Sequence, residues 1–143
     1  MNELMNVADE GNFLLDFSSK RNSFCTFNPT TQEEKIDFYN QVNTPQKRLK
    51  EMINMEITLK HVYAETITFI DRETGEGIPG VRMVFIDDKG VSYQAASKGV
   101  YSCTQKLFQI FGMPSEWKKP VKIRPKEISK GPNSNVLVYE IVK

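Results

Sequence analysis

The chain of 143 residues has few of the side chains on which catalysis and metal binding usually depend. It has one histidine, His61, and two cysteines, Cys25 and Cys103, which lie far apart in the sequence. A single histidine without a nearby cysteine does not supply the ligands of a zinc site. The nucleophile motif G-x-S-x-G and a phosphate-binding loop that ends in Gly-Lys-Ser or Gly-Lys-Thr are also absent. We therefore expect a protein that is not an enzyme and that uses no metal or cofactor.

Long apolar runs are missing as well. No stretch approaches the roughly eighteen consecutive apolar residues that a membrane-spanning helix needs. The first residues, MNELMNVADEGNFLLDF, have acidic side chains where a signal peptide has basic ones. In a reducing compartment the two cysteines are free thiols. These features predict a cytoplasmic protein that has no membrane partner.

The N-terminal part of the chain differs in pattern from the rest. Residues 1–29 have no sustained periodicity and are expected to form a flexible tail. Residues 30–54 are expected to form a peripheral helical segment with one or two short helices, because Thr31 and Glu34 have the spacing of a capping box. Residues 55–143 form the main domain. The tail contains one apolar cluster, which we expect to dock on another copy of the chain and so to mediate self-association: Phe13, Leu14, Leu15 and Phe17.

Apolar and polar residues alternate from residue 55 onward, which predicts strands. The first strand is long and needs a bulge near residues 62–65, because otherwise His61, Tyr63 and Glu65 would face the core. One helix is expected within this region, since apolar residues recur there at spacings of three and four. The expected elements are strands over 56–70, 81–86 and 91–95, a helix over 98–111, and strands over 121–126 and 136–142. This order predicts a mainly β fold, the five-stranded OB-fold barrel with its helix between the third and fourth strands.

The net charge of +1 hides an uneven distribution. Nine basic and three acidic side chains lie between residues 98 and 143. Binding of a polyanion depends on such a local excess more than on the total charge. The alternative is a lysine-rich face that only keeps the protein soluble.

Nucleic-acid binding needs cations for the phosphates and flat rings on which exposed bases stack. Outward positions of the expected strands and their loops supply polar and basic candidates: Lys60, Arg72, Arg82, Gln94, Lys122, Arg124 and Lys126. The candidate rings are Tyr63, Tyr93 and Tyr101. Tyr93 fits the barrel core equally well, and Tyr101 fits a position that caps the barrel end. Trp117 is expected to be a partly buried anchor after the helix, with base stacking as the alternative.

Three segments of the main domain have a characteristic order and spacing: ITFIDRETGEGIPGVRMVFIDDKGVSY, KGVYSCTQKLFQIFG and MPSEWKKPVKIRPKEI. With them, residues 55–142 resemble the OB-fold single-stranded-DNA-binding proteins that conjugative plasmids and phages of Gram-positive bacteria encode. The resemblance implies binding of single-stranded DNA with little sequence preference, homo-oligomerisation, and a role in plasmid transfer or replication. Duplex DNA and RNA are alternative partners.

Two other interpretations do not involve nucleic acid. The segment over residues 70–81 is similar to the opening of prealbumin-like surface-adhesin repeats, which are all-β sandwiches. The expected helix over 98–111 argues against that class. The other interpretation is a cytoplasmic adaptor whose OB barrel binds protein.

Overall fold

Strands dominate the computed structural model, which describes residues 23–132 and 134–143. The cluster of Phe13, Leu14, Leu15 and Phe17 lies outside the described residues. Within them, no helix is long and apolar enough to cross a membrane. The elements are β1 (Ser23–Cys25), α1 (Gln32–Asn43), β2 (Lys47–Arg48), the 3-10 helix η2 (Leu49–Met52), β3 (Ile57–Ile70), β4 (Gly77–Asp87), β5 (Ser92–Ala95), α2 (Lys98–Phe111), the 3-10 helix η3 (Pro114–Glu116), β6 (Val121–Gly131) and β7 (Ser134–Ile141).

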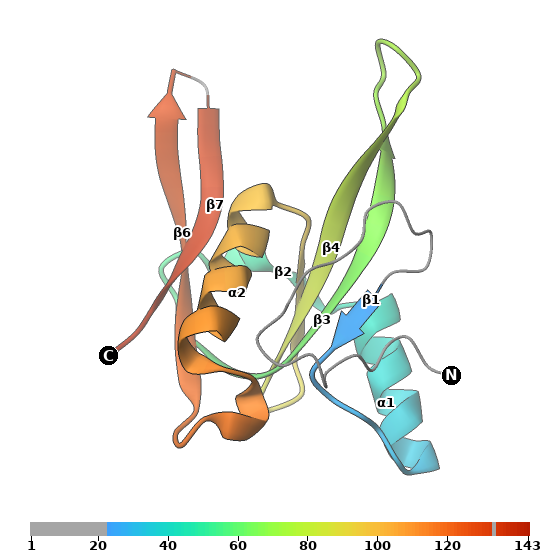
Figure 1. The fold of residues 1–143 in the computed structure, drawn as a ribbon, viewed down its shortest axis with the longest axis vertical. Coiled ribbons are helices and arrows are strands. Elements are labelled where there is room, and N and C mark those ends of the chain that lie inside the picture. The colour runs from blue at the N-terminus through green and yellow to red at the C-terminus, as the bar shows by residue number, and fades with distance from the viewer. Residues whose placement is uncertain (1–22, 133) are drawn as a thin grey trace.

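The seven strands of the described chain form one curled sheet in the order β2-β5-β4-β3-β6-β7, with β1 paired to β3. Neighbouring strands are antiparallel except β2 and β5, which are parallel. Figure 1 shows how the sheet curls, so that the β6–β7 hairpin and the β3–β4 hairpin stand on either side of α2. The result is a half-barrel that is compatible with an OB-like fold.

The expected five-stranded layout is wrong in its strand count and order. Two short strands, β1 and β2, add to the sheet, and two or three residues are too few to show an alternating pattern. The start of α2 contacts β7. A Cβ atom on Gly99 would overlap the carbonyl oxygen of Leu137. The hydroxyl of Ser97 donates to this same oxygen at 3.2 Å. Glycine and a hydroxyl together allow this close contact at the open side of the half-barrel.

The long strand β3 contains the expected bulge, but at Lys60, since its register with β4 shifts between Leu59 and His61. Before the bulge, Ile57 and Leu59 are buried in the core. After it, Val62 and Ala64 take over the inward positions. The bulge therefore turns the next polar side chains, beginning with His61, toward the other face of the sheet.

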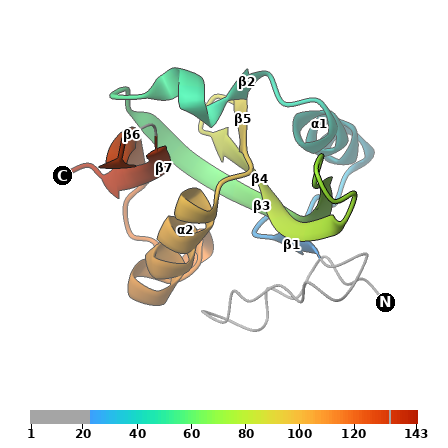
Figure 2. The ribbon, with the colours of Figure 1, turned by 90° about the horizontal axis from the view of Figure 1, so that it is seen from above.

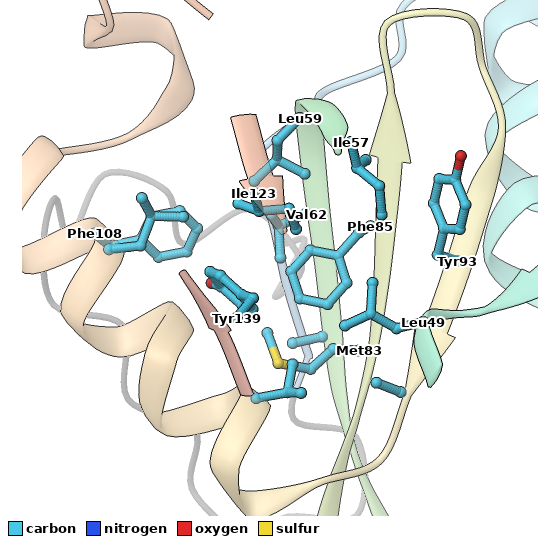
Figure 3. Close-up of a cluster of buried hydrophobic side chains, with 14 of the residues drawn as sticks. Leu49, Ile57, Leu59, Val62, Met83, Phe85, Tyr93, Phe108, Ile123 and Tyr139 are labelled. Carbon is cyan, nitrogen blue, oxygen red and sulfur yellow. The ribbon is translucent and has the colours of Figure 1, made fainter. Parts of the chain in front are cut away.

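The main core lies between the concave face of the sheet and α2 (Figure 3). Val81, Met83 and Phe85 point into it, as the alternation in β4 predicts. The rings of Phe85 and Tyr139 meet edge to face, with 5.8 Å between their centroids. Residues from β3, β6, α2 and η2 complete this core, which closes one end of the curled sheet.

A second, smaller cluster lies on the opposite face of the sheet. Phe38 of α1 packs there with Cys25, Val84 and Ile86. Figure 2 shows α1 and α2 on different sides of the β3–β4 ribbon. The capping box expected for the helix start is present, because Thr31 accepts from the amide of Glu34 and Glu34 accepts from that of Thr31. As a consequence, α1 covers part of the outer face that the sequence suggests to be open.

Candidate nucleic-acid interface

An open groove lies between the outer ends of the two long hairpins. Figure 1 shows the β3–β4 and β6–β7 hairpins extending past the first turn of α2, which lies between them. Two hollows, of about 500 and 370 Å³, adjoin there and share Ser97 and Lys98. We call this region the hairpin groove. It is lined by Phe69, Ile78, Pro79, Gly80, Val81, Ala96, Ser97, Lys98 and Tyr101 in one hollow, and by Lys50, Gly99, Glu127, Asn135, Val136 and Leu137 in the other.

The wall of the groove on the β3–β4 hairpin presents an exposed ring. Phe69 is 43% exposed, and Ile78 on the paired strand is exposed to the same extent. The ring of Phe69 lies against Gly80 so closely that a Cβ atom there would overlap it. The glycine therefore lets the ring lie against the hairpin backbone. An aromatic face held in this way is suited to stacking against an unpaired base.

Cations lie in and beside the groove. Lys50 and Lys98 are exposed in its lining, and Glu127 belongs to the same hollow as both. Arg72 is exposed at the turn of the β3–β4 hairpin, next to Asp71, whose carboxylate accepts from two backbone amides of the turn. The groove is thus more apolar than basic.

Only one of the three predicted rings lines this groove. Tyr101 lies half-buried at its edge, packed against the core. Tyr93 is a core residue whose hydroxyl donates to Asp87 at 3.0 Å, and burial raises the pKa of Tyr93 to about 12. Tyr63 packs edge to face with Phe38 under α1 and donates to a carboxylate oxygen of Glu65 at 2.8 Å. Burial likewise raises the pKa of Tyr63.

Arg82 and Gln94 point to the outer face, as predicted, but other protein groups surround them. Arg82 donates to a carboxylate oxygen of Glu65 at 3.2 Å and to the side-chain oxygen of Gln94 at 3.4 Å. It also donates to the backbone carbonyl of Val42 in the last turn of α1. Four-fifths of this side chain is shielded from solvent. The guanidinium thus holds α1 on the sheet.

The basic row on β6 is partly neutralised by its neighbours. Arg124 donates to Glu140 at 2.6 Å and to Glu56 at 3.1 Å, and these hydrogen bonds raise the pKa of Arg124. The ammonium of Lys126 lies 3.7 Å from the Glu140 carboxylate. Lys122 is exposed on the same strand. Glu140 meets this row because the register of β6 and β7 places it opposite Arg124.

Three residues of the groove are not predicted from the sequence: Phe69, Lys98 and Lys50, which lies in the peripheral segment over residues 30–54. Phe69 shares its parity with Ile57 and Leu59, which suggests an inward position, but the bulge at Lys60 reverses that parity. Lys98 contributes to the basic excess but stands at a helix start, not on a strand. Lys60 lies apart from the groove, exposed in a separate hollow with Trp117, Lys118 and Lys119.

A curled β half-barrel, with a ring and cations at an open groove between two hairpins, is typical of proteins that bind single-stranded nucleic acid. Residues 17–140 match the family model of the phage single-stranded DNA-binding protein. The match spans most of the chain, which therefore belongs to this family. Searches of curated proteins and of solved structures give no match. Membership of the family supports single-stranded DNA as the ligand.

Proposed function

We propose that the protein is an OB-type barrel that binds single-stranded DNA with little sequence preference across the hairpin groove. The observation that supports this most directly is the exposed ring of Phe69, which lies on Gly80 beside the cationic start of α2. In OB-folds, oligonucleotides bind on the second and third strands and on the loops after the first and fourth. The corresponding elements here are β4 and β5 with the turns of the β3–β4 and β6–β7 hairpins.

The geometry suggests how a strand would be bound. Bases stack on Phe69 and against Tyr101, while Lys98 and Lys50 in the lining meet phosphates and Arg72 at the turn of the β3–β4 hairpin adds positive charge. Stacking tolerates any base, because every base has a π face. Stacking of this kind therefore predicts little sequence preference. Under this proposal the protein acts by binding and not by catalysis, in the cytoplasm, during transfer or replication of plasmid or phage DNA.

Fluorescence anisotropy with labelled oligo-dT over a series of salt concentrations tests the proposal. Replacing Phe69 by alanine should lower the affinity about 5- to 150-fold, which corresponds to about 1–3 kcal/mol for one stacked base. Tyr39→Ala is the matched control, because Tyr39 is a 63% exposed ring on α1, away from the groove. If Phe69→Ala bound oligo-dT as tightly as the unaltered protein does, the assignment of the groove as the binding site would be contradicted. No binding at low salt would contradict the function and favour a protein-binding adaptor.

Self-association is a second part of the proposal. The apolar side chains of Phe13, Leu14, Leu15 and Phe17 are proposed to dock on a neighbouring copy, because four large apolar residues within five positions favour burial. Deleting residues 1–22, which leaves β1 intact, should lower the oligomeric mass in light scattering. An unchanged mass would refute this role of the tail.

A further inference from the structure

A second hollow with basic side chains lies at the other end of α2 from the hairpin groove. It has a volume of about 210 Å³. We call it the basic pocket and define it by Leu59, Lys60, Pro114, Trp117, Lys118 and Lys119, with Pro120 at its edge. Its three lysines are exposed. None of the ion pairs found in residues 23–132 and 134–143 involves them.

Carboxylates occur near the basic pocket, but they have other contacts. Glu116 turns its carboxylate toward Gly112, where an added Cβ atom would overlap it. Lys60 also borders a neighbouring hollow that includes Glu34, Asp37 and Asp87. Lys118 and Lys119 do not line that hollow. They are therefore the two cations best placed to meet a phosphate.

Trp117 gives the basic pocket a ring in a fixed orientation. Its indole N–H donates to the backbone carbonyl of Gly112 at 2.9 Å, and part of the ring packs against the main core. The remainder is accessible. A ring that is already fixed loses little conformational freedom when a ligand contacts it. A fixed ring between lysines has the combination of groups that binds single strands elsewhere.

The position of the basic pocket relates it to the groove. The groove includes the first turn of α2, and the pocket is formed by the segment that follows its last residue together with Leu59 and Lys60 of β3. The 14 residues of α2 span about 21 Å at 1.5 Å per residue. At the rise of stacked bases in a DNA duplex, about 3.4 Å per nucleotide, a strand covers this length with about six nucleotides. That number lies within the range of about 4–16 nucleotides bound by one OB-fold.

We propose that the basic pocket is a second contact for the same DNA strand that occupies the hairpin groove. Lys118 and Lys119 bind its phosphates, and the accessible edge of Trp117 contacts a base or sugar. The inference rests on the proposed function, because it requires a single strand in the groove. It assigns a phosphate-binding role to a segment outside the strands and hairpins of the barrel.

The double variant Lys118→Ala/Lys119→Ala tests this proposal in anisotropy titrations with oligo-dT of about 16 and about 4 nucleotides. With the long strand, the slope of log K against log salt should become shallower by about 1.4, or about 0.7 for each lost phosphate contact. With the short strand, which cannot reach from the groove to the pocket, the variant and the unaltered protein should bind alike. Lys35→Ala/Lys89→Ala removes the same charge from exposed positions outside both sites and should change neither slope.

Trp117 supplies an independent readout, because it is the only tryptophan in the chain. Its emission should change when the long strand saturates the protein, and much less so in the double variant. An unchanged salt slope with the long strand, together with unchanged emission, would overturn the proposal. If the double variant lost the same affinity for the long and the short strand, this result would also contradict a strand that spans both sites. If the unaltered protein bound neither strand, the proposed function itself would fail.

Discussion

His61 makes the stability of the protein depend on pH in a way that can be calculated. Its imidazole stacks on Phe27, with 4.4 Å between ring centroids. Its Nδ1 atom is buried and has no hydrogen-bond partner among the described residues. Burial, and secondarily the charge of Lys60, lower the pKa of His61 from its ordinary value of 6.5 to about 4. The folded protein therefore keeps this side chain neutral at a pH where an unfolded chain protonates it.

The sign and size of the effect follow from this difference in pKa. As the pH falls below about 6.5, the unfolded chain takes up a proton that the folded chain does not bind until about pH 4. The free energy of unfolding therefore decreases over this interval. From about pH 7 to about pH 5, the full difference in pKa corresponds to a decrease of about 1.8 kcal/mol in the free energy of unfolding. Because the imidazole is only partly buried, solvent relieves some of its desolvation, and we expect about 1 kcal/mol.

Urea unfolding at several pH values, followed by circular dichroism, measures this loss. In His61→Phe the ring that stacks on Phe27 is kept and the titrating nitrogen is removed, so the decrease between about pH 7 and about pH 5 should disappear. The chain has no other histidine that titrates in this interval. Glu34 and Glu140 have lowered pKa values, so their protonation weakens the fold only at a lower pH. Equal pH dependence in the variant and the unaltered protein would refute the reasoning.

Two further predictions concern contacts that hold the elements together. Gly99→Ala should lower the free energy of unfolding by about 1–2 kcal/mol, since overlap with Leu137 outweighs the higher helix propensity of alanine. The control Gln109→Ala, at an exposed position of α2, should not lower the free energy of unfolding. Arg82→Ala should lower it by about 1–3 kcal/mol, because Glu65 and the Val42 carbonyl lose their donor. The salt dependence of DNA binding should stay the same in Arg82→Ala, and a shallower slope would show that Arg82 contacts phosphate instead.

Local patterns in the sequence predict several elements of the fold. The helix over 98–111 has the predicted bounds. The inward residues of β4 are also those that its alternation indicates. The short strands β1 and β2 are not predictable, because they exist only through pairing with β3 and β5. A strand of two or three residues is too short to show an alternating pattern in the sequence, even when it pairs with a distant strand.

The candidate site is harder to predict, because alternation separates two faces without showing what covers them. Arg82 and Tyr63 do point away from the main core, but α1 packs over the face to which they point. Arg124 lies on the predicted strand, but only the register of β6 and β7 reveals Glu140 opposite it. A single bulge at Lys60 decides whether Phe69 belongs to the core or to the groove. Each of these outcomes depends on a tertiary contact and not on local sequence.

Both ends of α2 offer a ring with lysines near it, but the two sites differ in their charged neighbours, and this difference has a consequence for binding. The hairpin groove offers Phe69 and apolar walls, and Glu127 lines the same hollow as Lys98 and Lys50, whereas no carboxylate of the described residues lines the basic pocket. Stacking on a ring releases no counterions, but phosphate contacts do. A strand confined to the groove should therefore bind with weak salt dependence, and a strand that reaches both sites with a steeper one. Under the two proposals together, salt dependence increases with strand length on a single protomer, before any cooperation between copies is involved.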